Sequence, residues 1–196
     1  MWESSRNRNE TIALCGEYDI ILIMKRDVYL NLLEWKKSKN RKPLILQGAR
    51  QVGKTYILKI FGETEYKDYL YINFDKNKEV KNIFEKDLEP ERVLSELELL
   101  FEKKIKEKDT LLIFDEIQEC PNALNSLKYF NEEAKEYHIV AAGSLLGVKL
   151  NGDRGFPVGQ VNFLNLYPLN FAEFLDAISR NDLRQALDTV KQGDQF

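Results

Sequence analysis

The sequence predicts an α/β fold: a five-stranded parallel sheet with helices on both faces, arranged as three αβα layers. Two patterns support this prediction. Short segments that are almost entirely apolar alternate with longer segments of helical periodicity, and strands that are apolar along their whole length are typical of parallel sheets buried on both faces. The most distinctive polar motifs also follow directly after these apolar segments, and such sheets bind ligands at the carboxyl ends of their strands.

Five segments are predicted to be strands. Each is short, rich in apolar, β-branched or aromatic residues, and most end at a glycine or a polar residue. In chain order they are 42–48 (KPLILQG), 69–75 (YLYINFD), 110–116 (TLLIFDE), 138–144 (HIVAAGS) and 160–169 (QVNFLNLYPL).

Helices are predicted between the strands from apolar residues at helical spacing. The helix after Lys54 is predicted to end at Gly62, because glycine commonly follows the last turn of a helix. Pro90 is predicted to begin another helix, because proline is favoured at the first helical position. Further amphipathic patterns begin near Met24, span 123–134 and close the chain at 181–196.

The length of 196 residues suits one domain with a sizeable core. Residues 1–23 are polar and without pattern, so they are predicted to be a disordered or non-native N-terminal extension, with Met24 as the natural start. Residues 24–178 are predicted to form the core, and 179–196 the start of a truncated helical C-terminal region.

The composition limits the partners and the compartment. The 29 basic and 32 acidic residues leave a net charge of −3, so nucleic acid is not indicated as a partner. No apolar run approaches the ~20 residues that a membrane span needs. Cys15 and Cys120 lie far apart without a CxxC spacing, which indicates free thiols in a reducing compartment. We expect a cytoplasmic protein.

One motif predicts a phosphate-binding loop. GARQVGKT (48–55) matches G-x-x-x-x-G-K-[ST] at every fixed position. In such a loop, backbone N–H groups and the positive end of the following helix face phosphate oxygens. Lys54 would reach the β- and γ-phosphates, and the Thr55 hydroxyl would bind Mg²⁺. The residues predicted to bind nucleotide are Gly48, Ala49, Arg50, Gln51, Val52, Gly53, Lys54, Thr55 and Tyr56.

Two acids end the third predicted strand and supply the carboxylates that a phosphate-loop site needs. Asp115 can hold Mg²⁺ opposite Thr55, and Glu116 can face an attacking water, because neighbouring residues point to different sides of a strand. Without the loop, an acid pair at a strand end would indicate only a solvated turn.

Ser144 follows the fourth predicted strand, where its hydroxyl could contact the γ-phosphate or the water; the alternative is a hydroxyl that begins a loop. His138 begins that strand, far from its carboxyl end, and is predicted to be structural. Guanine recognition would need an N-K-x-D motif late in the sheet, whereas NKEV at 77–80 has valine in place of the aspartate. ATP is therefore favoured.

Five segments together resemble a group of prokaryotic AAA-superfamily ATP-binding proteins: GARQVGKT, YINFD, LLIFDEIQECP, AAGSLLG and FPVGQVNFLNLYPLNFAEFL. The resemblance runs from about Met24 to Leu175. It implies a P-loop NTPase sheet in which 48–55 is the Walker A motif and 111–116 the Walker B motif. The strand at 138–144 would then lie between the two Walker strands.

The resemblance also implies roles for single residues. Asp115 would be the magnesium acid, Glu116 the catalytic base and Ser144 the sensor-1 residue, with Lys54 as a further catalytic group. Gln160 departs from the family, whose members usually carry Arg or Lys there, and a cation that stabilises transferred charge can be worth 10³–10⁵ in rate, as an order of magnitude. Arg154 is a weak candidate to replace it.

The length is a second departure. Relatives continue into a helical or winged-helix region and a C-terminal domain of unassigned function, whereas this chain ends at Phe196. The resemblance therefore implies a truncated chain whose lid is largely missing, with the uncovered lid side open to a protein partner or to self-association.

Three functions stay open from the sequence. The first is a Mg²⁺-dependent ATPase core whose ATP hydrolysis drives a conformational switch in an attached or partner domain. The second is a nucleotide-binding module that binds ATP without turnover, which Gln160 and the missing lid favour and Glu116 opposes. The third, a small-molecule phosphotransferase, is disfavoured because the glycine-rich loop 143–159 holds a single arginine.

Overall fold

The structure, a computed structural model, describes residues 26–143 and 159–189. Its centre is one five-stranded sheet in the order β2-β3-β4-β1-β5, and every pair of neighbours is parallel. The elements in chain order are α1 (Asp27–Lys37), β1 (Leu44–Gln47), α2 (Lys54–Glu65), β2 (Asp68–Asn73), α3 (Lys78–Lys86), α4 (Pro90–Phe101), β3 (Thr110–Asp115), a 3-10 turn (Ile117–Glu119), α5 (Pro121–Glu133), β4 (His138–Gly143), β5 (Asn162–Asn165), α7 (Phe171–Ala177) and α8 (Asn181–Thr189).

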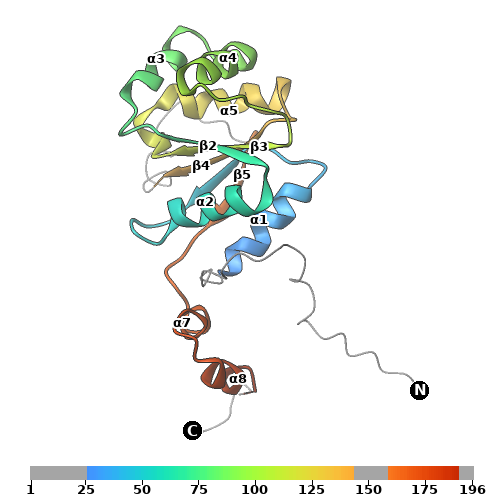
Figure 1. Cartoon of the computed structure of the whole chain (residues 1–196), viewed down its shortest axis with the longest axis vertical. Coiled ribbons are helices and arrows are strands. Elements are labelled where there is room, and N and C mark those ends of the chain that lie inside the picture. Colours follow the sequence, from blue (N-terminus) through green and yellow to red (C-terminus); the bar gives the residue numbers. More distant parts are fainter. Residues whose placement is uncertain (1–25, 144–158, 190–196) are drawn as a thin grey trace, which may run out of the picture.

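This architecture confirms the predicted fold class. Helices α3, α4 and α5 cover one face of the sheet, and α1 and α2 cover the other (Figure 1). Strand β4 lies between β1 and β3, as the family resemblance implied. Since all five strands are parallel, the ends of β1 and β3 that carry the sequence motifs meet at one edge of the sheet.

Alternate residues of the central strands fill two separate hydrophobic cores. Ile45 and Phe114 point toward the side of α3, α4 and α5, whereas Leu46 and Ile113 point toward α1 and α2. All six residues of β3 and of β4 are buried. A fully buried side chain of this kind stabilises the fold by about 1.5–3 kcal/mol relative to an exposed one, so the strand positions are fixed by burial on both faces.

The prediction that Gly62 ends a helix is wrong. Helix α2 continues to Glu65, and Gly62 is buried within it. A Cβ atom at this position would lie 2.9 Å from the Cβ and Cγ atoms of Tyr69. The glycine therefore allows α2 to pack closely against β2. Pro90 does begin α4, as predicted.

Helix α3 is absent from the sequence-based prediction. It is held by an aromatic cluster in which Phe74, Phe84 and Phe114 meet edge to face, with ring centroids 5.6–6.0 Å apart. Asn77, the first residue of the NKEV segment, precedes this helix, and its side-chain oxygen accepts from the backbone N–H of Asn73. The fifth strand is also shorter than the predicted range of 160–169.

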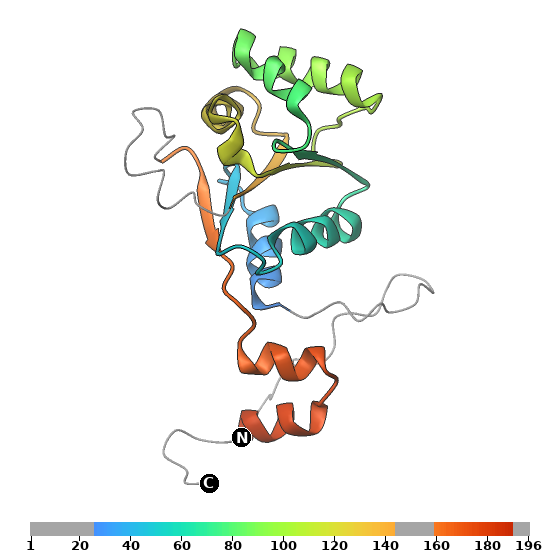
Figure 2. The ribbon, with the colours of Figure 1, turned by 90° about the vertical axis from the view of Figure 1, so that its left-hand side faces the viewer.

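Helices α7 and α8 lie away from the sheet and are joined to it by the segment that follows β5 (Figure 2). None of the helices in the described part of the chain is long and apolar enough to cross a membrane. Cys120 is buried with a free thiol. The predicted extension 1–23, Ser144, Arg154 and nearly all of the glycine-rich loop 143–159 lie outside the described residues.

Candidate functional site

The phosphate loop, residues 48–53, connects the end of β1 to the start of α2. Gln51 and Gly53 both have left-handed backbone angles, with φ of 62° and 96°. Alternation of this kind turns successive N–H groups toward a common concave side, which is an anion-binding arrangement. At Gly48 the reason for glycine is steric, because a Cβ atom there would lie 2.3 Å from the carbonyl oxygen of Leu166.

Lys54 is the first residue of α2 and is buried. Its Nζ donates to the carbonyl oxygens of Gly48 (3.0 Å) and Ala49 (2.6 Å) in the phosphate loop. Burial lowers the pKa of Lys54, and the charges of Glu116 and Asp115 counter part of that effect. The Lys54 ammonium group thus lies across the phosphate loop that precedes it. The negative charges of Glu116 and Asp115 favour its charged form.

Asp115 ends β3 with a buried carboxylate. The Thr55 hydroxyl donates to its Oδ2 at 2.8 Å, across 60 residues of sequence. The Tyr71 hydroxyl donates to the same oxygen at 2.7 Å. Burial, followed by this hydrogen bond, raises the pKa of Tyr71 to about 12, so the phenol stays a donor. The structure therefore brings together Thr55 and Asp115, which the sequence predicted as one pair of metal ligands.

Glu116 follows β3 directly, in a left-handed conformation (φ 51°, ψ 44°). One of its carboxylate oxygens accepts a short hydrogen bond from Nε2 of Gln118. Its own N–H donates to Oδ1 of Asp115 at 3.1 Å. The side chains of the two adjacent acids thus have different hydrogen-bond partners. Within the described residues, Oε1 of Gln118 is buried without a hydrogen-bond partner.

Gln160 does not lie at this site. It precedes β5, and its side-chain oxygen accepts a short hydrogen bond from Asn131 on α5. Asn162 pairs with Leu44 at the start of β1, whereas the phosphate loop follows the end of β1. The five residues that follow Gln160 to the end of β5 span roughly 16 Å at ~3.3 Å per residue. A cation at position 160 would therefore lie at the opposite edge from this chain's own loop.

His138 begins β4, at the edge opposite the phosphate loop. It is buried, its Nδ1 is 2.7 Å from the Tyr66 hydroxyl, and the Trp35 ring meets it edge to face. Burial lowers its pKa to about 4, helped by the positive charges of Arg41 and Lys36. These contacts fit the structural role that the sequence predicted.

Three residues at or beside the site were not singled out from the sequence: Tyr71, Gln118 and Arg26. Tyr71 counted only as a strand residue, and Gln118 carries no recognisable pattern. Arg26 precedes α1 and donates to the Val52 carbonyl of the phosphate loop at 3.1 Å. The sequence holds a recognisable pattern only for its partner Glu173, because Asn170-x-x-Glu173 has the form of a helix capping box.

The family model of the AAA domain matches residues 40–175. That range is more than half of the sequence and contains both sequence motifs and the whole sheet. The chain belongs to the AAA domain family. This confirms the resemblance stated from the sequence. No curated protein matches the chain.

Solved structures are similar to this chain at low sequence identity. The Walker-type ATPase PABY2304 of Pyrococcus abyssi has a TM-score of 0.54 at 18% identity, over 86% of this chain and 64% of its own. PCH-2 of C. elegans has a TM-score of 0.46 at 14% identity, over 86% of this chain and 49% of its own. The ORC1 protein of Aeropyrum pernix, solved with DNA, has a TM-score of 0.46 at 15% identity, over 85% of this chain and 49% of its own. This chain therefore spans less than two thirds of each of these proteins.

Proposed function

We propose that the chain binds ATP with Mg²⁺ and hydrolyses it to ADP and phosphate. The observation that supports this most directly is the hydrogen bond between Thr55 and Asp115 beside a phosphate loop that Lys54 closes. A hydroxyl at a helix start and a carboxylate at a neighbouring strand end are the two protein ligands with which P-loop enzymes hold magnesium.

The donor set fits Mg²⁺ by its chemistry. Thr55 and Asp115 offer only oxygen ligands, and Mg²⁺ prefers few protein oxygens, with waters and phosphates completing its shell. Within residues 26–143 and 159–189, no group of three or more His, Cys, Asp or Glu side chains could form an all-protein metal cage. When bound, Mg²⁺ would neutralise charge on the phosphate oxygens.

The chain's own residues would do the remaining work. The N–H groups of residues 48–55 and the side chain of Lys54 hold the phosphates, and Tyr56 lies exposed on the first turn of α2 beside them. Glu116 polarises the attacking water. Ser144 is proposed as the polar group facing the γ-phosphate. Catalysis of this kind relies on positioning and charge stabilisation.

We further propose that hydrolysis drives a conformational switch in an attached or partner domain. In this division, residues 24–178 form the AAA-type core and residues 179–196 begin a helical region. Tyr167, Phe171 and Phe174 expose large apolar side chains between the sheet and α8, a surface suited to a covering protein partner or a second copy.

The alternative is binding without turnover. The Gln118 side chain favours it, because it donates to the Glu116 carboxylate that would have to polarise water. Gln160 no longer supports this alternative, since it lies at the other edge of the sheet. Both functions require nucleotide binding, and they differ in turnover alone.

The test of nucleotide binding is the affinity for Mg-ATP of the parent and of Lys54→Ala. Removal of the ammonium group is expected to weaken binding about ten- to a hundredfold, the range that corresponds to the loss of one charge-assisted hydrogen bond. Lys103→Ala is the matched control, because Lys103 also donates to a backbone carbonyl, that of Tyr69. Equal affinity in Lys54→Ala and the parent would refute the phosphate-loop assignment.

A further inference from the structure

The guanidinium of Arg26 contacts three parts of the chain, each at least 26 residues away from it in sequence. Its Nε donates to Oε1 of Glu173 on α7 at 3.1 Å. Its Nη1 donates to the carbonyl of Val52 in the phosphate loop at 3.1 Å, and its Nη2 to the carbonyl of Tyr167 after β5 at 2.5 Å. The side chain is only 7% exposed. All three nitrogens of the guanidinium therefore have partners, each on a different segment.

Glu173 is equally well satisfied. Its Oε1 also accepts from the backbone N–H of Asp27 at 2.9 Å, and its Oε2 accepts from that of Asn170 at 3.0 Å. Its side chain is 8% exposed. Buried ion pairs contribute little net stability, because desolvation offsets most of their attraction, and one of their attested uses is to fix a particular arrangement.

The contact with Val52 fixes one peptide of the phosphate loop. In a trans peptide the carbonyl and the following N–H point in opposite directions. By holding the Val52 carbonyl, Arg26 directs the Gly53 N–H the opposite way within the same peptide plane, away from the guanidinium. Gly53 has a left-handed φ of 96°, and a Cβ built there would lie 3.9 Å from Arg26 Nη1. The peptide so held immediately precedes Lys54.

The same network reaches α7. The segment after β5 lies along the loop, because the Leu166 N–H donates to the Gln47 carbonyl at 2.7 Å and its carbonyl faces Gly48. Only Glu173 and Leu175 of α7 are buried, and α7 lies beyond the edge of the sheet (Figure 2). The ion pair is thus a principal attachment of α7 to the core.

We infer that Arg26 is a positioning residue of the phosphate loop, and that its ion pair with Glu173 makes α7 respond to what the loop holds. This inference rests on the proposed nucleotide binding. Phosphate bound by the Gly53 N–H tightens the Val52–Gly53 peptide against Arg26, and Arg26 transmits that restraint to the first turn of α7.

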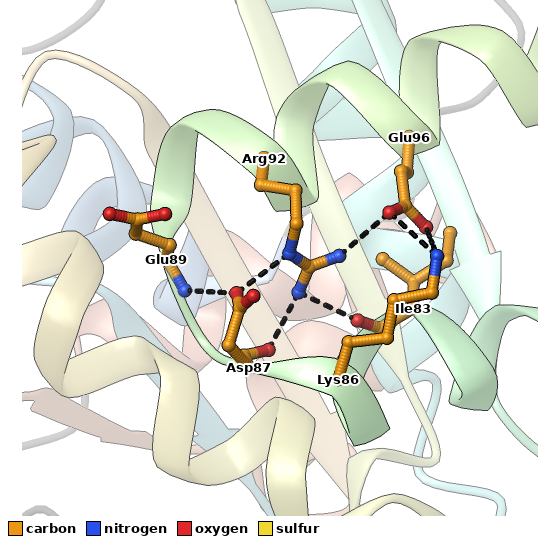
Figure 3. Close-up of polar contacts among 6 residues, drawn as sticks. All are labelled: Ile83, Lys86, Asp87, Glu89, Arg92 and Glu96. Atoms are coloured by element: carbon orange, nitrogen blue, oxygen red, sulfur yellow. Dashed lines mark hydrogen bonds and ion pairs between the residues drawn. The ribbon is translucent and has the colours of Figure 1, made fainter.

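The experiment measures the affinity for Mg-ADP and hydrogen–deuterium exchange in peptides covering 47–58, 170–178 and 90–101. It compares the parent with Arg26→Gln, Arg26→Lys and Glu173→Gln, at a temperature where unfolding curves show each protein folded. Arg92→Gln is the matched control: Arg92 also joins carboxylates and carbonyls, those of Asp87, Glu96 and Ile83, but in α3 and α4 (Figure 3).

In the parent, Mg-ADP is expected to slow exchange in both 47–58 and 170–178. Arg26→Gln and Arg26→Lys should bind Mg-ADP at least about tenfold more weakly, the size of one charge-assisted hydrogen bond. Arg26→Lys should not restore the affinity, because an ammonium group cannot make the planar, forked set of contacts that the guanidinium makes. Glu173→Gln should bind nearly as well as the parent, yet lose the response of 170–178. Arg92→Gln should alter exchange only in 90–101.

Each contrary result has a definite meaning. A folded Arg26→Gln that binds Mg-ADP like the parent would overturn the positioning role. Unchanged exchange of 170–178 in the saturated parent would overturn the link to α7, even if Arg26→Gln does not fold. Retained response in Glu173→Gln would show that α7 senses nucleotide directly, which also overturns the link through the ion pair. If the parent binds no nucleotide, the proposed function fails first, which is a separate outcome.

Discussion

Thr55 and Tyr71 donate hydrogen bonds to one and the same oxygen of Asp115, Oδ2, at 2.8 and 2.7 Å. Thr55 lies in the first turn of α2, Tyr71 on β2 and Asp115 at the end of β3. If Mg²⁺ takes the Thr55 hydroxyl as a ligand, that hydroxyl must turn its lone pair to the metal, and Tyr71 is left to hold Asp115 in place. The two donors therefore have separable roles in the proposed site.

Replacing Thr55 tests the first of these roles. Thr55→Val removes the hydroxyl but keeps the shape, so it should lose most of the dependence of nucleotide affinity on Mg²⁺. Thr55→Ser keeps the hydroxyl and should retain that dependence. Titration of ATP with Mg²⁺ and with a chelator measures the difference. Equal Mg²⁺ dependence in the valine and serine variants would remove Thr55 from the metal site.

Replacing Tyr71 tests the second role. Tyr71→Phe should raise the Mg²⁺ concentration for half-maximal ATP binding several-fold, since a hydrogen bond to a charged group is worth about 1.5–3 kcal/mol. Affinity at saturating Mg²⁺ should change little. Tyr69→Phe is the control, because it lies on the same strand and its hydroxyl donates to the exposed Glu63 instead. Identical Mg²⁺ titrations of Tyr71→Phe and the parent would contradict this role.

Gly62 should not tolerate alanine. Helix propensity alone favours Gly→Ala by about 1 kcal/mol, but a Cβ would lie 2.9 Å from Tyr69, and overpacking costs about 1–3 kcal/mol. We expect Gly62→Ala to lower the free energy of unfolding by about 1 kcal/mol in urea denaturation. A variant more stable than the parent would mean that α2 and β2 can move apart at no cost.

His138 should make stability depend on pH. The folded protein keeps it neutral down to about pH 4 because its pKa is lowered from 6.5 to about 4, whereas the unfolded chain takes up a proton near pH 6.5. Unfolding therefore binds a proton in this window, and stability falls as the pH drops from 6.5 toward 4. The loss approaches about 3 kcal/mol at 1.36 kcal/mol per pKa unit.

Denaturant unfolding across this pH window measures the effect in the parent and in His138→Phe. The phenylalanine variant should lose less stability than the parent as the pH falls. Tyr66→Phe removes the hydroxyl beside the ring but keeps the histidine, so it should retain the parental slope. Parallel curves for the parent and His138→Phe would show that another group causes the pH dependence.

The parts of the fold that were predictable are those encoded locally. Strand segments such as 111–114 are apolar throughout because both of their sides are buried, and the phosphate-loop motif is contiguous over eight residues. The position of β4 between β1 and β3 also followed, through the family resemblance. The prediction for Gly62 failed because glycine has the same appearance in sequence at a helix end and at a close helix–strand contact.

The network around Arg26 could not be predicted, because it depends on tertiary contacts. Arg26 and Glu173 are 147 residues apart, and neither shows a periodic or spaced pattern that points to the other. Tyr71 looks like any aromatic strand residue in the sequence; only the pairing of β2 with β3, two residues short of Asp115, lets its hydroxyl reach Asp115. For Gln160, the residue type suggested that a catalytic cation is missing, whereas its position before β5 removes it from this chain's own site.

We propose that the site hydrolyses ATP through Glu116. The most direct test is phosphate release from Mg-ATP by the purified chain beside Glu116→Gln, with nucleotide affinity measured in both. We expect the parent to release phosphate and Glu116→Gln to bind Mg-ATP equally well but lose turnover by about 10²-fold or more, the scale of general-base catalysis. Tight binding without release in either protein, or equal release in both, would contradict hydrolysis through Glu116.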